Sequence, residues 1–451
     1  MLEFITSQKG TRKLVVLGYL FTKNKDGSDG KEFWRCDIRT CKARVHTRGN
    51  FILLEIGVHN HTVIHGRITV EATRSRMKRR AETTEEATRS IVHNELLQIP
   101  DTAAHLLPRR ETLARDVRRH RQKAGPNDLQ DITAYAQTQS GQPFLRIEND
   151  TMLIFAADDD LQFLSRCDHW FADGTFRVSP PGFDQLYTIH GFINGEVFPA
   201  IYALIHERTE DIYRSLLQEI LTLKSGLNPV SIVVDFELAA IRAFQHTFQA
   251  ATVTGCMFHF GQCVWRKLQS EGLSARYRDE PDFALRVKCL LALAFVPVAE
   301  VIQTYENLTQ GPTYRDLDVI CDYMEDNFIG RERRGQRRQP RFPIELWNQY
   351  LRVITNLPRS NNNIEGWHNA FNNVVGFAHP TPTKLARKLQ QEQHSTQLLR
   401  RQLELGVPAG KKKKMYIRIN EALCTMVSDY INRDPIVYLG DIARVLNINV
   451  V

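Results

Sequence analysis

Three short acidic stretches, far apart along the 451-residue chain, constrain its fold more than any other feature. The segments HWFADGTF and SIVVDFE place Asp173 and Asp235 at or just past the end of β-branched and aromatic runs. Such runs are typical of strands, which would carry each aspartate to the edge of a sheet. The segment NNNIEGWH places Glu365 where a polar run gives way to a helical pattern. Three carboxylates gathered from such places can hold two divalent metal ions, the arrangement that in-line phosphoryl transfer uses.

The order of these segments resembles that of a known family. An acid after an apolar strand is common and usually structural, but Asp-Gly-Thr-Phe first and Asn-Asn-x-x-Glu-Gly-Trp-His last is a more specific combination. Together the segments resemble the D-D-E set of Mutator-like element (MULE) transposases. The resemblance implies an α/β fold with an RNase H-like catalytic core. It also implies that Asp173 bridges two Mg²⁺ or Mn²⁺ ions, while Asp235 and Glu365 each complete one metal shell.

The segment GCMFH adds a C-x2-H pattern, Cys256 and His259, between Asp235 and Glu365. MULE and related hAT transposases carry such a pair at this place. The resemblance puts His259 near the scissile phosphate as a catalytic residue that donates a hydrogen bond, with Cys256 packing beside it. The residues alone leave two alternatives open, a second zinc half-site with Cys263 or a core histidine, although two ligands cannot close a zinc shell.

Three residues around the acids carry weaker predictions. His368 follows Glu365 by three places on the same helical face and is expected to approach the metals or the phosphate. Trp347 matches a family tryptophan that precedes the Asn-rich segment; it either stacks on an unpaired base or lies in the core. Glu237 would point away from Asp235 if the strand continued, which argues against it as a metal ligand.

Near the N-terminus, a second motif predicts a zinc site. Trp34, Cys36, Cys41, His59 and His61 form the pattern W-x-C-x4-C-x17-H-x-H. Two thiolates and two imidazoles complete a tetrahedral zinc shell, which can supply folding energy to a small domain. The alternative is two unrelated cysteines and two surface histidines. The pattern resembles a FLYWCH zinc finger, although its C-x4-C gap is shorter than in many members, and the resemblance implies binding of DNA or protein.

The formal charge of +8 is unevenly distributed. Residues 1–123 carry 25 Lys and Arg against 14 Asp and Glu, so this quarter has a net charge of +11 and the rest −3. A basic quarter joined to a near-neutral body is typical of a nucleic-acid-binding segment, the alternative being a solvated helical surface. A second basic run, Arg331 to Arg341, is the competing DNA-binding candidate. The densest cluster, which we predict to bind DNA and which could serve as a nuclear localisation signal, is Arg74, Arg76, Lys78, Arg79 and Arg80.

The pattern after residue 150 predicts alternating strands and helices. The expected strands are 170–171, 187–193, 197–205, 231–234 and 251–257, and the expected helices are 211–223 and 238–248. Three strands, a helix, a strand, a helix and a strand form the element order of an RNase H-like core. Residues 262–345 have mainly helical patterns and separate the second acid from the third, so we expect a helical insertion.

Length and composition predict several soluble domains, because 451 residues exceed one ordinary domain. No apolar run is long enough to span a bilayer, and eight cysteines favour reduced thiols in an intracellular protein. The short apolar runs and turns of residues 1–66 predict a small antiparallel β unit. The expected parts are this β-rich finger (1–66), a basic helical segment (67–130), the first part of the core (150–262), the insertion (263–345), the end of the core with the glutamate (346–400) and a C-terminal helical tail (401–451).

These patterns predict a nuclear DNA transposase that cuts element ends and joins the freed 3′-hydroxyl to target DNA. Its expected partners are DNA (element ends and target) and further copies of itself on DNA, and no membrane; its expected cofactors are one structural Zn²⁺ and two catalytic Mg²⁺ or Mn²⁺ ions. Two alternatives remain. One is a domesticated DNA-binding regulator without catalysis, for which three desolvated acids have no obvious use. The other is a nuclease of the same fold without strand transfer.

Overall fold

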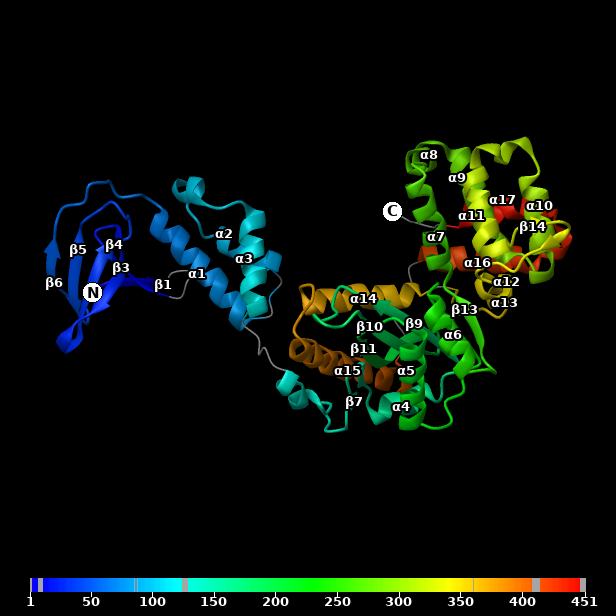
Figure 1. Cartoon of the computed structure of the whole chain (residues 1–451), viewed down its shortest axis with the longest axis horizontal. Helices are drawn as coiled ribbons and strands as arrows, with labels where there is room; N and C mark the ends of the chain where they lie inside the picture. The colour runs from blue at the N-terminus through cyan, green and yellow to red at the C-terminus, as the bar shows by residue number, and fades with distance from the viewer. Residues whose placement is uncertain are drawn as a thin grey trace. The chain divides into compact units, whose positions relative to one another are not determined.

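The chain folds into two compact units, whose elements Figure 1 labels. The computed structural model describes residues 2–6, 11–84, 86, 88–123, 129–359, 361–407 and 414–446. The first unit comprises residues 1–128 and 375–384, and the second comprises residues 129–374 and 385–451. Within the described ranges, no helix combines the length and the apolar character that crossing a bilayer requires.

A six-stranded antiparallel sheet opens the first unit, as the short apolar runs and turns of its sequence predict. Its strands follow chain order: β1 (Glu3–Thr6), β2 (Arg12–Val16), β3 (Tyr19–Asp26), β4 (Lys31–Cys36), β5 (Arg44–Arg48) and β6 (Phe51–Ile56). Leu17 and Gly18 join β2 to β3 with φ of 48° and 82°, the double positive φ that a tight two-residue hairpin needs. Trp34 is fully buried in the small core and donates a hydrogen bond to Thr47 at 2.9 Å.

Three helices follow the sheet in the same unit. They are α1 (Arg67–Thr83), α2 (Thr88–Leu96) and α3 (Arg110–Lys123), with the 3-10 turn η2 (Asp101–Leu106) between α2 and α3. Their shared core contains Met77 from α1, Ile91 from α2 and Val117 from α3, all nearly inaccessible to solvent. The segment GPND, residues 125–128, has the composition of a turn and lies outside the described residues.

A seven-stranded mixed sheet forms the centre of the second unit. Its spatial order is β13-β12-β9-β10-β11-β8-β7. The strands are β7 (Leu145–Glu148), β8 (Met152–Phe155), β9 (His169–Thr175), β10 (Gln185–Ile193), β11 (Glu196–Ile205), β12 (Ser231–Val234) and β13 (Thr252–Gly255). β12 is parallel to both β9 and β13, whereas β10 is antiparallel to its neighbours β9 and β11. The unit is therefore a mixed α/β structure.

Helices cover both faces of this sheet, with a large apolar core on one face and a small apolar cluster on the other. α4 (Asp158–Leu164), α5 (Glu210–Leu223) and α6 (Leu238–Thr247) contribute to the large core, which also includes Trp170 and Ile232 of the sheet. The opposite face holds a small cluster of Phe171, Val233, Cys256 and Ile364. Ile364 comes from α14 (Asn362–Val375), so this helix covers the second face.

The strand and helix predictions hold with two differences. The predicted strand 251–257 ends at Gly255, because Cys256 is the N-cap of the next helix, α7 (Met257–Ser270). β7 and β8 were not predicted; they extend the sheet beyond β11 in antiparallel pairing. β8 is buried along its whole length, and such short apolar runs have no periodicity that separates a strand from a buried helix.

The region after α7 is helical, as predicted. It contains α8 (Ser274–Asp279), α9 (Pro281–Ala292), α10 (Val301–Thr309), η6 (Pro312–Leu317), α11 (Asp318–Met324), the π-turn η7 (Glu325–Ile329), α12 (Ile344–Trp347) and α13 (Tyr350–Ile354), with a small hairpin of β14 (Glu332–Arg333) and β15 (Gln336–Arg337). After α14 come α15 (Pro382–Glu404), α16 (Lys414–Ser428) and α17 (Pro435–Val445). α17 packs against α9 and α10, so the C-terminal helices contribute to the core of the insertion (Figure 1).

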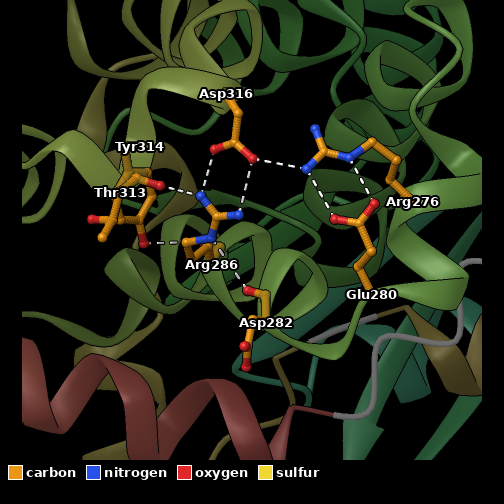
Figure 2. A network of polar contacts seen from close by, with 7 residues as sticks. All are labelled: Arg276, Glu280, Asp282, Arg286, Thr313, Tyr314 and Asp316. Atoms are coloured by element: carbon orange, nitrogen blue, oxygen red, sulfur yellow. Dashed lines mark hydrogen bonds and ion pairs between the residues drawn. The ribbon is translucent and has the colours of Figure 1, made fainter.

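A network of polar contacts joins α8, α9 and η6 on the surface of the insertion (Figure 2). Asp316 of η6 accepts hydrogen bonds from Arg276 at 2.9 Å and from Arg286 at 3.0 Å. Arg276 also binds Glu280 through two nitrogen–oxygen contacts of 2.9 Å. The two guanidinium groups lower the pKa of Asp316 to about 2. One carboxylate thus fastens the short turn η6 to two helices.

Replacing Asp316 with asparagine should destabilise the second unit slightly. The lowered pKa means that the contribution of Asp316 is present above its unfolded-state pKa, near 4, and disappears as the pH falls towards 2. The ion pairs of Asp316 with Arg276 and Arg286 are partly exposed to water. We therefore expect the free energy of unfolding to fall by only about 0.5–1 kcal/mol at neutral pH. Urea unfolding of the two proteins at neutral pH measures the difference; an equal difference near pH 2 would contradict this electrostatic origin.

Candidate active site and zinc site

The fold brings the first two predicted acids side by side. Asp173 lies within β9, and Asp235 follows the last residue of β12 directly. These strands are parallel neighbours in which Val233 pairs with Phe171. Continuing that register by two residues brings Asp235 level with Asp173 on strands about 4.8 Å apart. Because side chains alternate along a strand, Asp173 faces the same side as Phe171.

The third predicted acid reaches this face from α14. Glu365 lies in the first turn of the helix, beside Ile364, which packs against Phe171 and Val233. Its negative charge raises the pKa of Asp173, as does that of Asp235. Three acids from distant parts of the chain therefore share one region above the sheet.

The shared region holds the acids in an environment that disfavours their charged forms. Burial raises the pKa of Asp235 to about 6 and that of Glu365 to about 7. Burial is also the main cause that raises the pKa of Asp173 well above its usual value. One oxygen of Asp235, Oδ1, is inaccessible and has no hydrogen-bond partner. Neighbouring buried acids with an unpartnered oxygen fit a divalent cation, because oxygen ligands of this kind are what Mg²⁺ prefers.

The carboxylate oxygens do not converge on one point. Among the residues that the structure describes, the only group of three or more His, Cys, Asp or Glu with donor atoms all within 4.8 Å of one another lies in the finger. The acids are instead turned towards local partners. Asp173 accepts a hydrogen bond from the Gly174 amide at 2.9 Å and faces His368 Nδ1 at 3.7 Å.

Two histidines line the acids, as the sequence predicted for this region. His259 Nε2 lies 3.6 Å from Glu365 Oε1, and its Nδ1 is buried without a partner. His368, besides facing Asp173, lies with Nε2 3.4 Å from the Thr188 hydroxyl. Burial lowers the pKa of each histidine to about 4. Both imidazoles are therefore neutral at pH 7 and can donate or accept hydrogen bonds.

Asn361 is a positioning residue that sequence reasoning missed. It is fully buried; its side chain donates to the Ala172 carbonyl at 3.2 Å, and its backbone amide donates to Cys256 Sγ at 3.1 Å. One residue thereby ties the third acidic segment to the first segment and to the C-x2-H pair. The run of three asparagines before Glu365 was the available signal. Burial raises the pKa of Cys256 to about 12, so its thiol stays protonated, and together with Cys263 it belongs to no metal group in the described part of the chain.

The structure also shows the surroundings of Trp347 and Glu237, for which the sequence supports weaker predictions. Trp347 is fully buried and donates to the Phe328 carbonyl at 3.1 Å, so it is a core residue and not a base-stacking surface. Glu237 is the N-cap residue of α6, because β12 does not continue that far. Its carboxylate accepts a hydrogen bond from the Tyr213 hydroxyl at 3.1 Å, and burial raises its pKa to about 7. Glu237 is thus a buried acid close to Asp235 with a local partner.

The finger residues converge, as the motif predicted. Cys36 Sγ lies 3.3 Å from His61 Nε2, Cys41 Sγ lies 3.4 Å from His59 Nδ1, and the two histidine nitrogens are 3.3 Å apart. These separations match the edges of a tetrahedron around zinc with metal–ligand bonds of about 2.0–2.3 Å. Tyr19 stacks on His59 with ring centroids 3.6 Å apart and fixes the plane of that imidazole. The cluster therefore supports a structural Zn²⁺ held by two thiolates and two imidazoles.

The predicted DNA-binding run lies on α1, where acids neutralise most of it. Four of its members form ion pairs: Arg74 with Asp116 at 2.9 Å, Arg76 with Glu95 at 2.8 Å, Arg80 with Glu95 at 3.0 Å and Lys78 with Glu82 at 3.8 Å. Glu95 is buried, so it depends on its two arginines for compensation. Arg79 is the exposed member of the run. Most of these cations hold the helices together.

Two family models match parts of the chain. Residues 4–61 match the model of the FLYWCH zinc finger domain, which includes all four zinc-site residues. Residues 169–262 match the model of the MULE transposase domain, which includes Asp173, Asp235 and His259 but ends before Glu365. The chain is therefore similar to a FLYWCH zinc finger domain in its N-terminal part and to a MULE transposase domain further along, and the second match supports a transposase.

A comparison with solved structures gives a remote similarity. A solved structure, the Drosophila P element transposase strand transfer complex, is similar over 72% of this chain and 91% of its own, with 10% sequence identity and a TM-score of 0.29. A similarity at this level carries no argument about mechanism. No curated protein matches the sequence.

Replacing Asp235 with asparagine should change how the stability of the metal-free protein depends on pH. The folded-state pKa of about 6 lies above the unfolded value, so the contribution of Asp235 to stability falls as the pH rises from about 4 through 6. The Asp235→Asn variant has no ionisable group at this position, so its stability does not fall in this way. We therefore expect its Tm in magnesium-free buffer to exceed that of the wild type at about pH 8 and to match it near pH 4.

Thermal unfolding of both proteins at the two pH values measures this difference. Asp150, which is exposed, provides the matched control, because Asp150→Asn should leave the pH profile of Tm unchanged. Saturating Mg²⁺ at pH 8 should stabilise the wild type and not Asp235→Asn. A Tm difference that is the same at both pH values would contradict the buried, ionisable state of Asp235.

Proposed function

We propose that the protein is a DNA transposase of the Mutator-like type that cleaves DNA strands and transfers them through Asp173, Asp235 and Glu365. The observation that carries the proposal is the joint placement of these acids on one face of the sheet, with raised pKa values and an unpartnered Asp235 oxygen. The match to the MULE transposase domain supports it independently.

We further assign the core of the second unit to the RNase H-like fold. Strands β9, β10 and β11 are consecutive in the chain and adjacent in space, and β12 and β13 add to the other side of β9 in parallel. Among these five strands β9, which carries Asp173, is the middle one, and β12, which Asp235 follows, is its parallel neighbour. The third acid comes from a helix beyond the insertion, which explains the long separation of Glu365 from the other two.

The residues of the site have distinct roles in this proposal. Asp173, Asp235 and Glu365 would hold two Mg²⁺ or Mn²⁺ ions, which activate a water or 3′-hydroxyl and stabilise the leaving oxygen. His259 is neutral and lies at the edge of the acids, so it can donate a hydrogen bond to a phosphate oxygen. His368, whose Nδ1 lies 3.7 Å from Asp173 Oδ2, would orient that carboxylate. The substrate would be the ends of the element and then a target duplex, bound by a homo-oligomer in the nucleus.

The test is strand cleavage of a duplex that carries the inverted repeats flanking the coding sequence. With Mg²⁺ or Mn²⁺, full-length protein should produce a free 3′-hydroxyl end and then join it to a second plasmid. Cleavage without joining would instead identify a nuclease. Binding of the repeats without cleavage would support the other candidate, a transposase-derived regulator, and would overturn the catalytic proposal.

A further inference from the structure

The outer face of α3 carries three arginines in one stripe. Arg115, Arg118 and Arg119 are exposed, and their spacing of three and four residues puts them on one side of the helix. The opposite side carries Leu113 and Val117, which are almost completely buried against α1 and α2. The arginine stripe therefore points away from the helical bundle.

The arginine stripe has no ion-pair partner among the residues that the structure describes. In the part of the first unit that the structure describes, none of its three guanidinium groups forms an ion pair with a carboxylate. Arg118 donates instead to the carbonyl of Ala114 in its own helix at 3.2 Å. Asp116, the acid closest in sequence, pairs with Arg74 of α1. The contrast with α1 is direct, because four of the five basic residues there are paired.

Further cations lie at the start of the helix, on a different side of its axis from the arginine stripe. Arg109 and Arg110 are exposed, and Arg110 approaches a ring nitrogen of His93 at 3.4 Å. Glu111, the one exposed acid of α3 among its described residues, lies four residues before Arg115 on the same side of the helix, and no ion pair joins it to the stripe arginines in the described part of the chain. The exposed face of α3 thus carries three arginines against one acid, and such an excess of positive charge attracts a polyanion.

The chemistry of this face fits nucleic-acid phosphates better than a protein partner. No large apolar side chain of α3 is exposed among its described side chains, whereas the centre of a protein interface is usually apolar or aromatic. Arginines bind phosphate oxygens with two parallel hydrogen bonds. A single helix with its side chains also fits the width of the DNA major groove.

We propose that α3, through Arg115, Arg118 and Arg119, is the helix of the first unit that binds duplex DNA. The proposal rests on the proposed function, since it names the surface that would grip the transposase substrate. It differs from the sequence-based prediction, which assigned this role to the run on α1. The α1 cations would instead be structural, and the zinc finger and α3 would belong to one DNA-binding unit.

Fluorescence anisotropy of full-length protein on a short labelled duplex tests this assignment over a series of salt concentrations. The variant Arg115→Ala/Arg118→Ala/Arg119→Ala should bind about 10- to 100-fold more weakly at about 0.1 M salt. The slope of log affinity against log salt should decrease by about two to three, because three phosphate contacts no longer release counterions. The triple lysine variant at the same positions should keep most of the affinity, which separates lost charge from misfolding.

The matched control removes three charges from the competing basic run. Arg333, Arg338 and Arg341 are exposed, and Arg333→Ala/Arg338→Ala/Arg341→Ala should change affinity and slope little. Unchanged binding of the α3 variant would overturn the assignment of α3 and leave the transposase proposal intact. A wild-type protein that fails to bind duplex DNA even at low salt would overturn both. Equal competition by polyglutamate and by DNA, at equal total charge, would identify a general polyanion surface and also overturn the assignment.

Discussion

Glu365→Gln should abolish metal-dependent DNA cleavage while leaving DNA binding unchanged. Glutamine keeps the size of the side chain but removes the negative charge that would complete a metal shell. We expect the rate of strand cleavage to fall by a factor of about 10³ or more, as is usual when a catalytic metal site is dismantled. Asp173→Asn and Asp235→Asn should have effects of similar size. Because the three act as one unit, a double variant should lose little more than either single variant.

Glu237 provides a demanding control for this prediction. Like Glu365 it is a partly buried glutamate near Asp235, and burial raises the pKa of both to about 7. It accepts a hydrogen bond from Tyr213 and lies at the start of α6, away from the face that α14 covers. Glu237→Gln should therefore retain most of the cleavage activity. Wild-type cleavage by Glu365→Gln, or loss of cleavage only in Glu237→Gln, would show that the third acid is misassigned.

Much of the second unit could be predicted from local sequence, because its elements are strongly patterned. The runs around Trp170 and Val233 have the β-branched and aromatic composition of strands; Asp173 lies within the first strand, two residues before its end, and Asp235 follows the second directly. The order of strands and helices then follows from their succession along the chain. What local patterns could not give is the pairing of β7 and β8 at the far edge, since strand neighbours depend on tertiary packing.

The charged residues of the candidate site could be predicted from the sequence, whereas the residues that position them could not. An acid after a strand is visible in sequence, whereas the role of Asn361 depends on two contacts, with Ala172 and Cys256, that join distant segments. The α1 run illustrates the same limit with the opposite result. Its positive charge is evident from the sequence, but the compensation by Glu95 and Asp116 exists only after the helices pack together.

Loss of the zinc ion should unfold the six-stranded sheet of the first unit. The sheet has a small core, in which Cys36 and Cys41 are themselves among the buried residues around Trp34. Its last strand, β6, is exposed along its whole length and contributes little burial. Zinc binding in small finger domains supplies about 10–16 kcal/mol, which exceeds what such a core provides without metal. Cys36→Ser should therefore lose both the metal and the fold of residues 2–61, while the second unit stays folded.

Metal content and amide hydrogen exchange of the full-length protein measure this prediction. The wild type should contain about one zinc ion per chain, as a single Cys2His2 site requires, and protected amides in β2, β3 and β4. Cys36→Ser should lose the zinc and the protection of these three strands, with β9 to β12 unaffected. Cys424→Ser is the matched control, because Cys424 lies in the second unit and its thiol donates only to the Val353 carbonyl, at 3.7 Å. If Cys36→Ser lost its zinc but kept the protection of β2 to β4, the sheet would be stable through its apolar core and the metal would not be structural.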